Sequence, residues 1–137
     1  MSKKSFEVSL FDLALILSNA IDLISPVLHN HHKQVAYIAY HLGKELNLDT
    51  TNCNDLLIAG LLHDIGGLTL DDRLSALQFE AAKPHQHAVI GYLLLKDINH
   101  LLNVATIIKY HHLPWKNGQG QILEGSIVPL ESHIIHL

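Results

Sequence analysis

Histidine is the most unusual feature of this sequence, with 12 copies against nine lysines and arginines together. Imidazole is the commonest metal ligand in proteins, and a mixture of imidazole and carboxylate suits Fe, Mn, Zn, Co or Ni better than Ca²⁺ or Mg²⁺. The histidines that could do such chemistry form four clusters, which are His31 with His32, His63 with Asp64, His85 with His87, and His111 with His112. We therefore expect a divalent transition-metal centre.

The pair His63 and Asp64 is the most informative cluster, because it follows the apolar run LLIAGLL at residues 56–62. An ionisable pair behind such a run lies beside the core, where it needs a partner or a metal to offset the loss of solvation. Any one histidine at a helix end is commonly a capping or surface residue, and that alternative stays open for each cluster alone. Four clusters at predicted helix termini together favour one shared centre.

The spacing of apolar residues predicts helices along almost the whole chain. The third predicted helix is apolar nearly all round, so it belongs in the middle of the domain. Pro114 and the glycines at 118, 120 and 125 predict a loop. We expect an all-α fold, a bundle of about six to seven helices with the metal site between central helices. The first predicted helix begins at a Ser9 cap and ends at Ser25-Pro26, and the last begins at Pro129. The third covers roughly 54–63, and its first turn can start at Thr51 or Asn52. The others span 31–46, 71–79, 84–97 and 100–112.

Composition narrows the class of protein. The 137 residues are enough for one domain, and the net charge of -4 with scattered basic residues argues against a nucleic-acid duplex as partner. Cys53 is the single cysteine, which excludes an internal disulfide and favours a reducing compartment. Carboxylates at Glu7, Asp12 and Asp22 interrupt the N-terminal apolar stretch, which argues against a signal peptide or a membrane span. We expect a cytoplasmic protein.

The order H…HD…H…HH resembles the HD superfamily of metal-dependent phosphohydrolases, and more closely its HD-GYP branch, from about His31 to the end of the chain. HKQVAYIAYHLGKELNL is similar to the first motif, in which a histidine precedes valine by four, so Val35 selects His31 over His29 or His32. LLIAGLLHDIGG and IIKYHH resemble the HD and paired-histidine motifs. In HAVIGYLLL, Gly91 selects His87 over His85. The resemblance implies six metal ligands, which are His31, His63, Asp64, His87, His111 and His112.

The sequence also departs from that branch. Gly67 stands where the branch has a lysine, Leu113 stands where it has a glutamate, and WKNGQGQIL occupies the place of the GYP signature. The family's last ligand, an aspartate, would fall one or two positions beyond Leu137. We therefore expect an HD domain over 26–137 that is truncated at its C-terminal end, with residues 1–25 forming a helix packed on it. Without that aspartate, one of two ions should bind more weakly, so we expect at most one well-occupied metal position. With Gly67 in place of the lysine as well, we expect slow or undetectable hydrolysis of cyclic di-GMP.

This resemblance implies a metal-dependent phosphohydrolase that hydrolyses a phosphoester or phosphodiester at a binuclear centre. We expect Asp64 to bridge the ions, since it offers two oxygens, with His31 and His63 on one ion and the later histidines on the other. Asp64 and His63 are the predicted catalytic residues. The alternative is a catalytically weak metal-binding regulatory module of a larger signalling protein, as a homodimer or with a further C-terminal domain.

The expected substrate is a small phosphorylated molecule or nucleotide. Trp115 could stack on a nucleobase, and Lys116 could neutralise a phosphate in place of the missing lysine, as could Lys83 or Arg73. Each has an ordinary alternative that stays open, because a tryptophan can pack a loop onto the core and a lysine or arginine can be a solvated charge.

Overall fold

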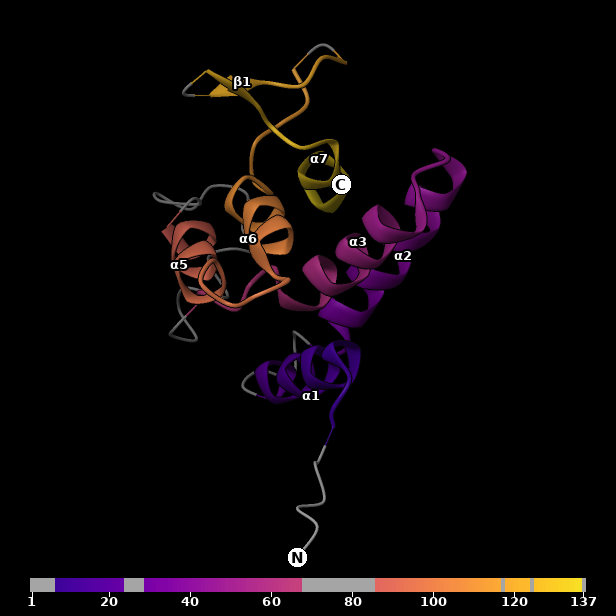
Figure 1. Cartoon of the computed structure of the whole chain (residues 1–137), viewed down its shortest axis with the longest axis vertical. Helices are drawn as coiled ribbons and strands as arrows, with labels where there is room; N and C mark the ends of the chain where they lie inside the picture. The colour runs from indigo at the N-terminus through magenta and orange to yellow at the C-terminus, as the bar shows by residue number, and fades with distance from the viewer. Residues whose placement is uncertain (1–6, 24–28, 68–85, 117, 124, 137) are drawn as a thin grey trace, which may run out of the picture.

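The computed structural model describes residues 7–23, 29–67, 86–116, 118–123 and 125–136. Within them the protein is helical apart from one short hairpin, which confirms the all-α prediction (Figure 1). The predicted helix over 71–79 lies outside the described residues. The helices are α1 (Leu10–Asp22), α2 (His31–Glu45), α3 (Thr50–Leu62), α5 (Gln86–Leu95), α6 (Leu102–Lys109) and α7 (Leu130–His136).

Two side chains cap helices that carry parts of the site. The Ser9 side chain accepts a hydrogen bond from the Asp12 backbone N–H, which is the predicted start of α1. Asp49 does the same for the backbone N–H of Asn52, so α3 begins at Thr50 and the predicted start at Thr51 or Asn52 is wrong. An aspartate is among the best N-cap residues.

Helices α2 and α3 form an antiparallel pair that runs side by side in Figure 1. Gly60 allows their close approach, because a Cβ atom at that position would lie 2.5 Å from the Cα of Ala36. A larger residue would force the two backbones apart. The pairing brings the start of α2, with His31, beside the end of α3, with His63.

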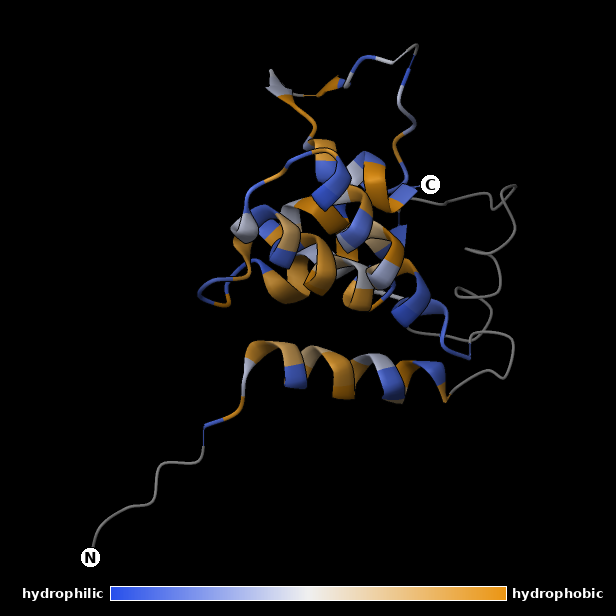
Figure 2. Cartoon of the chain, turned by 90° about the vertical axis from the view of Figure 1, so that its right-hand side faces the viewer, coloured by the Kyte–Doolittle hydropathy of each residue, from blue (hydrophilic) through white to orange (hydrophobic). Residues whose placement is uncertain are grey.

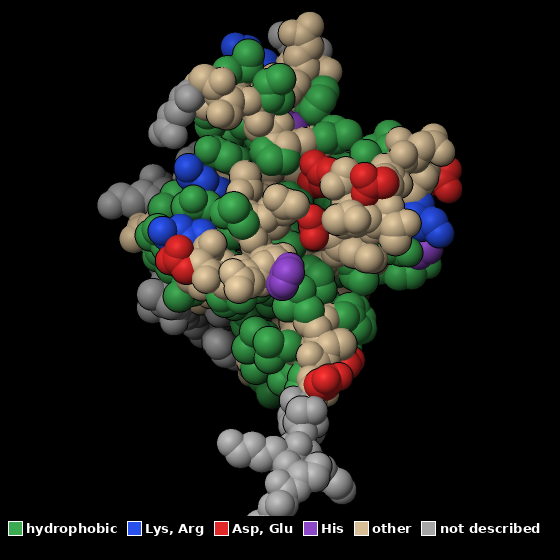
Figure 3. All heavy atoms as spheres, in the orientation of Figure 1, with side chains coloured by type: hydrophobic (Ala, Val, Ile, Leu, Met, Phe, Trp, Pro, Cys, Tyr) green, Lys and Arg blue, Asp and Glu red, His purple; other side chains and the backbone are tan. Residues whose placement is uncertain are grey.

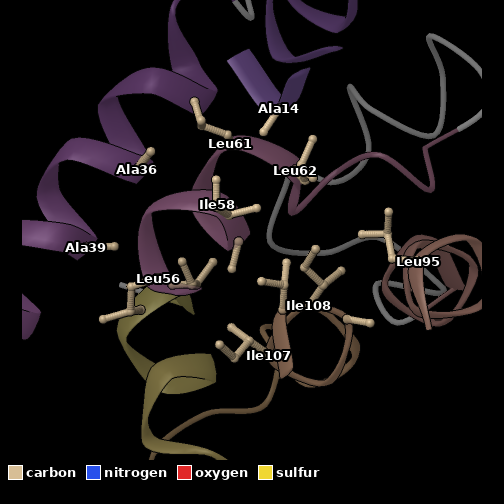
Figure 4. Close-up of a cluster of buried hydrophobic side chains, with 14 of the residues drawn as sticks. Ala14, Ala36, Ala39, Leu56, Ile58, Leu61, Leu62, Leu95, Ile107 and Ile108 are labelled. Atoms are coloured by element: carbon tan, nitrogen blue, oxygen red, sulfur yellow. The ribbon is translucent and has the colours of Figure 1, made fainter. Parts of the chain in front are cut away.

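The hydrophobic core is centred on α3, as its nearly uniform apolar surface predicts. Leu56 and Leu62 of α3 and Ile108 of α6 are almost completely buried and pack into the cluster shown in Figure 4. Helix α1 crosses beneath the other helices in Figure 2 and contributes Ala14 to the same cluster. The N-terminal helix thus packs on α2 and α3.

A second close approach lies between the turn after α3 and helix α5. A Cβ atom on Gly66 would lie 2.0 Å from the backbone oxygen of His87, and one on Gly91 would lie 3.0 Å from the Ile108 side chain. The lack of side chains at Gly66 and Gly91 therefore lets α5 sit against this turn and against α6. The contact places His87 near Asp64.

The loop before α7 contains a hairpin that the sequence did not predict. Strands β1 (Ile122–Leu123) and β2 (Ser126–Ile127) pair in antiparallel fashion, and Gly125 in their turn has φ +80°. Two residues per strand are too few to produce a recognisable alternation of polar and apolar residues.

The surface mixes charged and hydrophobic side chains, and hydrophobic ones are exposed over α1 on the face in Figure 3. None of the described helices has the length and apolar character needed to cross a membrane.

Candidate metal centre

Asp64 lies at the centre of a group of histidines and is itself only 6% exposed. Its Oδ2 atom is 3.2 Å from Nε2 of His63 and 4.0 Å from Nε2 of His31. Its Oδ1 atom is 3.2 Å from Nε2 of His87 and 3.8 Å from Nε2 of His111. The two carboxylate oxygens therefore face different sets of imidazole rings.

The structure brings together all six residues named as ligands from the sequence. The donor atoms form two groups, each with all atoms within 4.8 Å of one another. Asp64 belongs to both. The Nε2 atoms of His31 and His63 are 3.3 Å apart, and those of His87 and His112 are 2.8 Å apart. The first group is His31, His63 and Asp64, and the second is Asp64, His87, His111 and His112.

Backbone carbonyls orient two of the rings. Nδ1 of His63 donates a hydrogen bond to the Gly60 carbonyl at 2.9 Å, and Nδ1 of His111 donates to the Ile108 carbonyl at 2.7 Å. A neutral ring with its proton on Nδ1 has a lone pair on Nε2, and both Nε2 atoms are directed at Asp64. Nε2 of His111 is buried without a hydrogen-bond partner. This is the arrangement expected of metal-binding histidines.

Asp64 and His63 affect each other's protonation. Burial alone would raise the pKa of Asp64, but the charge of His63 and hydrogen bonds from His63 and His87 bring it well below its usual value. Burial alone would lower the pKa of His63, yet the adjacent Asp64 carboxylate raises it above 6.5. A cation bound at Asp64 would oppose the raised pKa of His63 and favour its neutral ring.

Three other rings, those of His31, His32 and His111, have lowered pKa values. Burial, together with the nearby charge of His63, lowers the pKa of His31 and lowers that of His32 to about 4. Burial and the charges of His63 and His112 lower the pKa of His111 well below 6.5. Because a histidine binds metal through a neutral nitrogen, these rings are in the ligand-competent state at neutral pH. The donor set and its protonation therefore fit a divalent transition metal.

His32 is the residue whose place the sequence did not reveal. The Val35 spacing selects His31, and His31 does lie in the cluster, but His32 is fully buried beside it. Its Nδ1 atom contacts the Asp22 carboxylate at the end of α1, and its Nε2 atom lies 3.8 Å from Asp64 Oδ2. No motif linked Asp22 to this histidine, because the two residues belong to different helices.

Other histidines divide into two kinds. His29, His41 and His100 are exposed and belong to neither group of possible ligands, and His85 lies outside the described residues. His133 and His136 belong to neither group of possible ligands, but both make hydrogen bonds to the segment that carries His111 and His112. Nδ1 of His133 donates to the Leu113 carbonyl and Nδ1 of His136 to the His111 carbonyl, each at 3.0 Å. Both rings on α7 therefore fix the backbone of the paired-histidine segment.

Trp115 and Lys116, the proposed substrate contacts, lie in the loop after that segment. The Trp115 ring packs edge to face on His133, with ring centroids 4.8 Å apart, and is 40% exposed. Lys116 is exposed and pairs through its backbone with Gln119. Neither belongs to the two groups of possible metal ligands found among the described residues. Their contact with substrate stays a prediction.

A separate pocket of about 250 Å³ lies between α3, α6 and α7. Two carboxylates and two amides face it, and no histidine is among its lining residues. Burial raises the pKa of one of these carboxylates, Asp55, although its hydrogen bond with Asn103 has the opposite effect. The pocket is thus distinct from the histidine cluster. It is lined by Asn52, Asp55, Asn103, Thr106, Ile107, Pro129 and Glu131.

Comparison with known proteins agrees with this geometry. The family model for the HD domain matches residues 28–137, and this chain belongs to the HD domain family. A 59-residue segment, 43% of this chain, is 36% identical to the 3'3'-cGAMP-specific phosphodiesterase 1 of Vibrio cholerae serotype O1. That segment spans only 14% of the phosphodiesterase. No solved structure matches the chain.

Proposed function

We propose that the protein is a metal-dependent phosphohydrolase whose centre takes two divalent transition-metal ions. The observation that carries this proposal is the position of Asp64, which directs one carboxylate oxygen at each of two groups of imidazoles. His31 and His63 would serve one ion, and His87, His111 and His112 the other. Asp64 would bridge them. The expected ions are Fe, Mn, Zn, Co or Ni.

Two bound ions of this kind lower the pKa of a water molecule towards neutrality and neutralise charge on phosphoryl oxygens. The chain's own contribution is to position the donors. Carbonyls of Gly60 and Ile108 orient His63 and His111. The charge of His63 and hydrogen bonds from His63 and His87 keep the pKa of Asp64 low despite its burial, so the carboxylate is ionised. Because these groups are ordered before a substrate arrives, the centre needs little reorganisation. Asp64 and His63 are therefore the proposed catalytic residues.

For the substrate, we propose a phosphodiester of nucleotide type. The support is the 59-residue similarity to a protein whose name is 3'3'-cGAMP-specific phosphodiesterase 1. The loop WKNGQGQIL, in place of the GYP signature, makes cyclic di-GMP the less favoured member of that class. Trp115 and Lys116 in this loop are exposed and are the proposed contacts for base and phosphate.

A regulatory metal-binding module is the second candidate. Gly67 is buried and Leu113 half-buried, where the HD-GYP pattern has a lysine and a glutamate. At these two described positions the chain therefore supplies neither a cation nor a carboxylate beside the ligands. A protein of this second kind would bind metal as predicted and hydrolyse phosphodiesters slowly or not at all.

Hydrolysis assays on metal-loaded protein test the proposal. The substrates are bis(p-nitrophenyl) phosphate, 3'3'-cGAMP and cyclic di-GMP, each with Mn²⁺, Co²⁺ or Fe²⁺. Asp64→Asn should lower kcat by about a hundredfold or more, since it removes a charge from both ions. Asp55→Asn, on the same helix but facing the separate pocket, is the matched control and should keep activity. Metal binding without turnover of any of these esters would favour the regulatory module.

A further inference from the structure

Helix α1 lies outside the segment matched by the HD family model, which begins at residue 28. Its last residue, Asp22, is nevertheless 7% exposed and makes a short contact through Oδ1 with Nδ1 of His32. His32 has no exposed surface. A carboxylate from α1 therefore reaches the edge of the metal centre.

The other nitrogen of His32 faces the centre. Its Nε2 atom is buried, has no hydrogen-bond partner and lies 3.8 Å from Oδ2 of Asp64. His31, the ligand expected from the motif, is 4.0 Å from the same oxygen. The His32 ring centroid is 5.3 Å from that of His31 and 5.1 Å from that of His63. By distance to Asp64, His32 is as well placed as the expected ligand.

The contact with Asp22 determines whether Nε2 of His32, the nitrogen that faces Asp64, is a hydrogen-bond donor or an acceptor. A carboxylate accepts a hydrogen bond, so Nδ1 carries the proton and Nε2 of the neutral ring is an acceptor. That acceptor faces a second acceptor, the Asp64 carboxylate, and a cation between them makes the arrangement favourable. Metal-bound histidines commonly donate their other ring N–H to a carboxylate in this way.

We propose that His32 is a further ligand of the metal centre on the Oδ2 side of Asp64, and that Asp22 positions it. The inference rests on the metal centre proposed above. The compact group on that side, His31, His63 and Asp64, does not include His32. Its addition gives four protein donors, the number typical of a tightly held zinc ion. A buried ion pair with a purely structural role is the competing explanation.

Metal titration of the metal-free 137-residue chain separates the two explanations. Co²⁺ affinity is measured by competition with a chromogenic chelator, together with the visible Co²⁺ spectrum and the melting temperature with and without Co²⁺. The variants are His32→Gln and Asp22→Asn. His41→Gln, an exposed histidine of α2, and Ser18→Ala, a buried polar residue of α1, are matched controls.

We expect His32→Gln to weaken one Co²⁺ site at least about tenfold and to change its spectrum, and Asp22→Asn to weaken the same site less. The stabilisation that Co²⁺ produces should shrink in both variants and stay unchanged in the controls. If both variants keep the affinity and spectrum of wild type, and melting falls equally with and without metal, the pair is structural and the inference is wrong. Should His32→Gln fail to fold, Asp22→Asn alone decides.

These outcomes are distinct from failure of the proposed function. Wild-type protein that binds Co²⁺ and loses affinity through His32→Gln, but hydrolyses no ester, would contradict only the enzymatic proposal. Wild-type protein that binds no Co²⁺ would contradict both.

Discussion

One buried carboxylate, Asp64, with imidazoles on both sides accounts for most of the chemistry of this centre. Oδ2 faces His63 at 3.2 Å and Oδ1 faces His87 at the same distance. Each further histidine joins one side or the other. Ligands on opposite sides should therefore affect different ions.

This division predicts selective losses. His31→Gln should remove one of two bound Co²⁺ ions and leave the second, whereas His111→Gln should remove the other, because the two residues belong to different groups. Equilibrium dialysis followed by elemental analysis gives the number of ions per chain. His100→Gln, an exposed histidine, is the control. Loss of both ions from each single variant would argue against two separable sites.

The lowered pKa values predict how metal-free protein responds to acid. In the unfolded chain, His31, His32 and His111 return to a pKa near 6.5, so below that pH the unfolded chain binds more protons than the folded one. Stability should therefore fall as pH falls from 6.5 towards about 4, the pKa of folded His32. The loss is up to about 1.4 kcal/mol per pH unit for each such proton. His63, with a raised pKa, acts in the opposite direction, and Asp64 titrates below this range.

Urea unfolding of the metal-free protein at pH 7 and pH 5 measures this effect. The free energy of unfolding should be clearly lower at pH 5, and His111→Gln should reduce the difference, since it removes one of the three groups. A free energy of unfolding that is equal at the two pH values would show that these histidines titrate normally in the folded protein.

At the scale of elements, the centre depends on two places where backbones meet without an intervening side chain. Gly60 lets α2 approach α3, and Gly66 lets α5 approach the turn after α3. Together they bring three separate segments of the chain to Asp64. A fourth segment carries His111 and His112. Hydrogen bonds from His133 and His136 of α7 to its backbone carbonyls hold it in place.

Gly66→Ala tests the second of these contacts. Its Cβ would lie 2.0 Å from the His87 carbonyl oxygen, so α5 must move, at a cost of about 3 kcal/mol. Displacement of His87 should also reduce metal content. In Gly120→Ala, the new Cβ meets its nearest neighbour at 3.6 Å, which is an ordinary contact. The free energy of unfolding and the metal content of this variant should therefore stay near those of wild type. Urea unfolding and elemental analysis of the two variants check the prediction, which fails if they behave alike.

Sequence reasoning predicted the helical elements well, because apolar periodicity and caps such as Ser9 are local signals. It also named Asp64 and the five histidines around it, because the four motifs resemble those of the HD superfamily. It missed the Asp22–His32 contact and the support from His133 and His136. Those contacts depend on how α1 and α7 pack on the other helices, and no pattern within either segment encodes that packing.

At the scale of the whole molecule, nearly every described helix supplies or positions a residue of the centre. Helices α2, α3 and α5 and the segment after α6 supply possible ligands, α7 supports that segment, and α1 reaches the centre through Asp22. The HD family model covers 28–137, so α1 is the part of this arrangement that family membership does not explain.

The central claim is that Asp64 joins two metal ions, and counting the ions bound by wild type and Asp64→Ala tests it most directly. Metal-free protein is titrated with Co²⁺ and the bound metal is measured by elemental analysis, with helical content monitored by circular dichroism. The account predicts two ions per wild-type chain, one of them held more weakly, and loss of most metal from Asp64→Ala with its helices intact. Wild-type metal content in a folded Asp64→Ala variant would contradict the account.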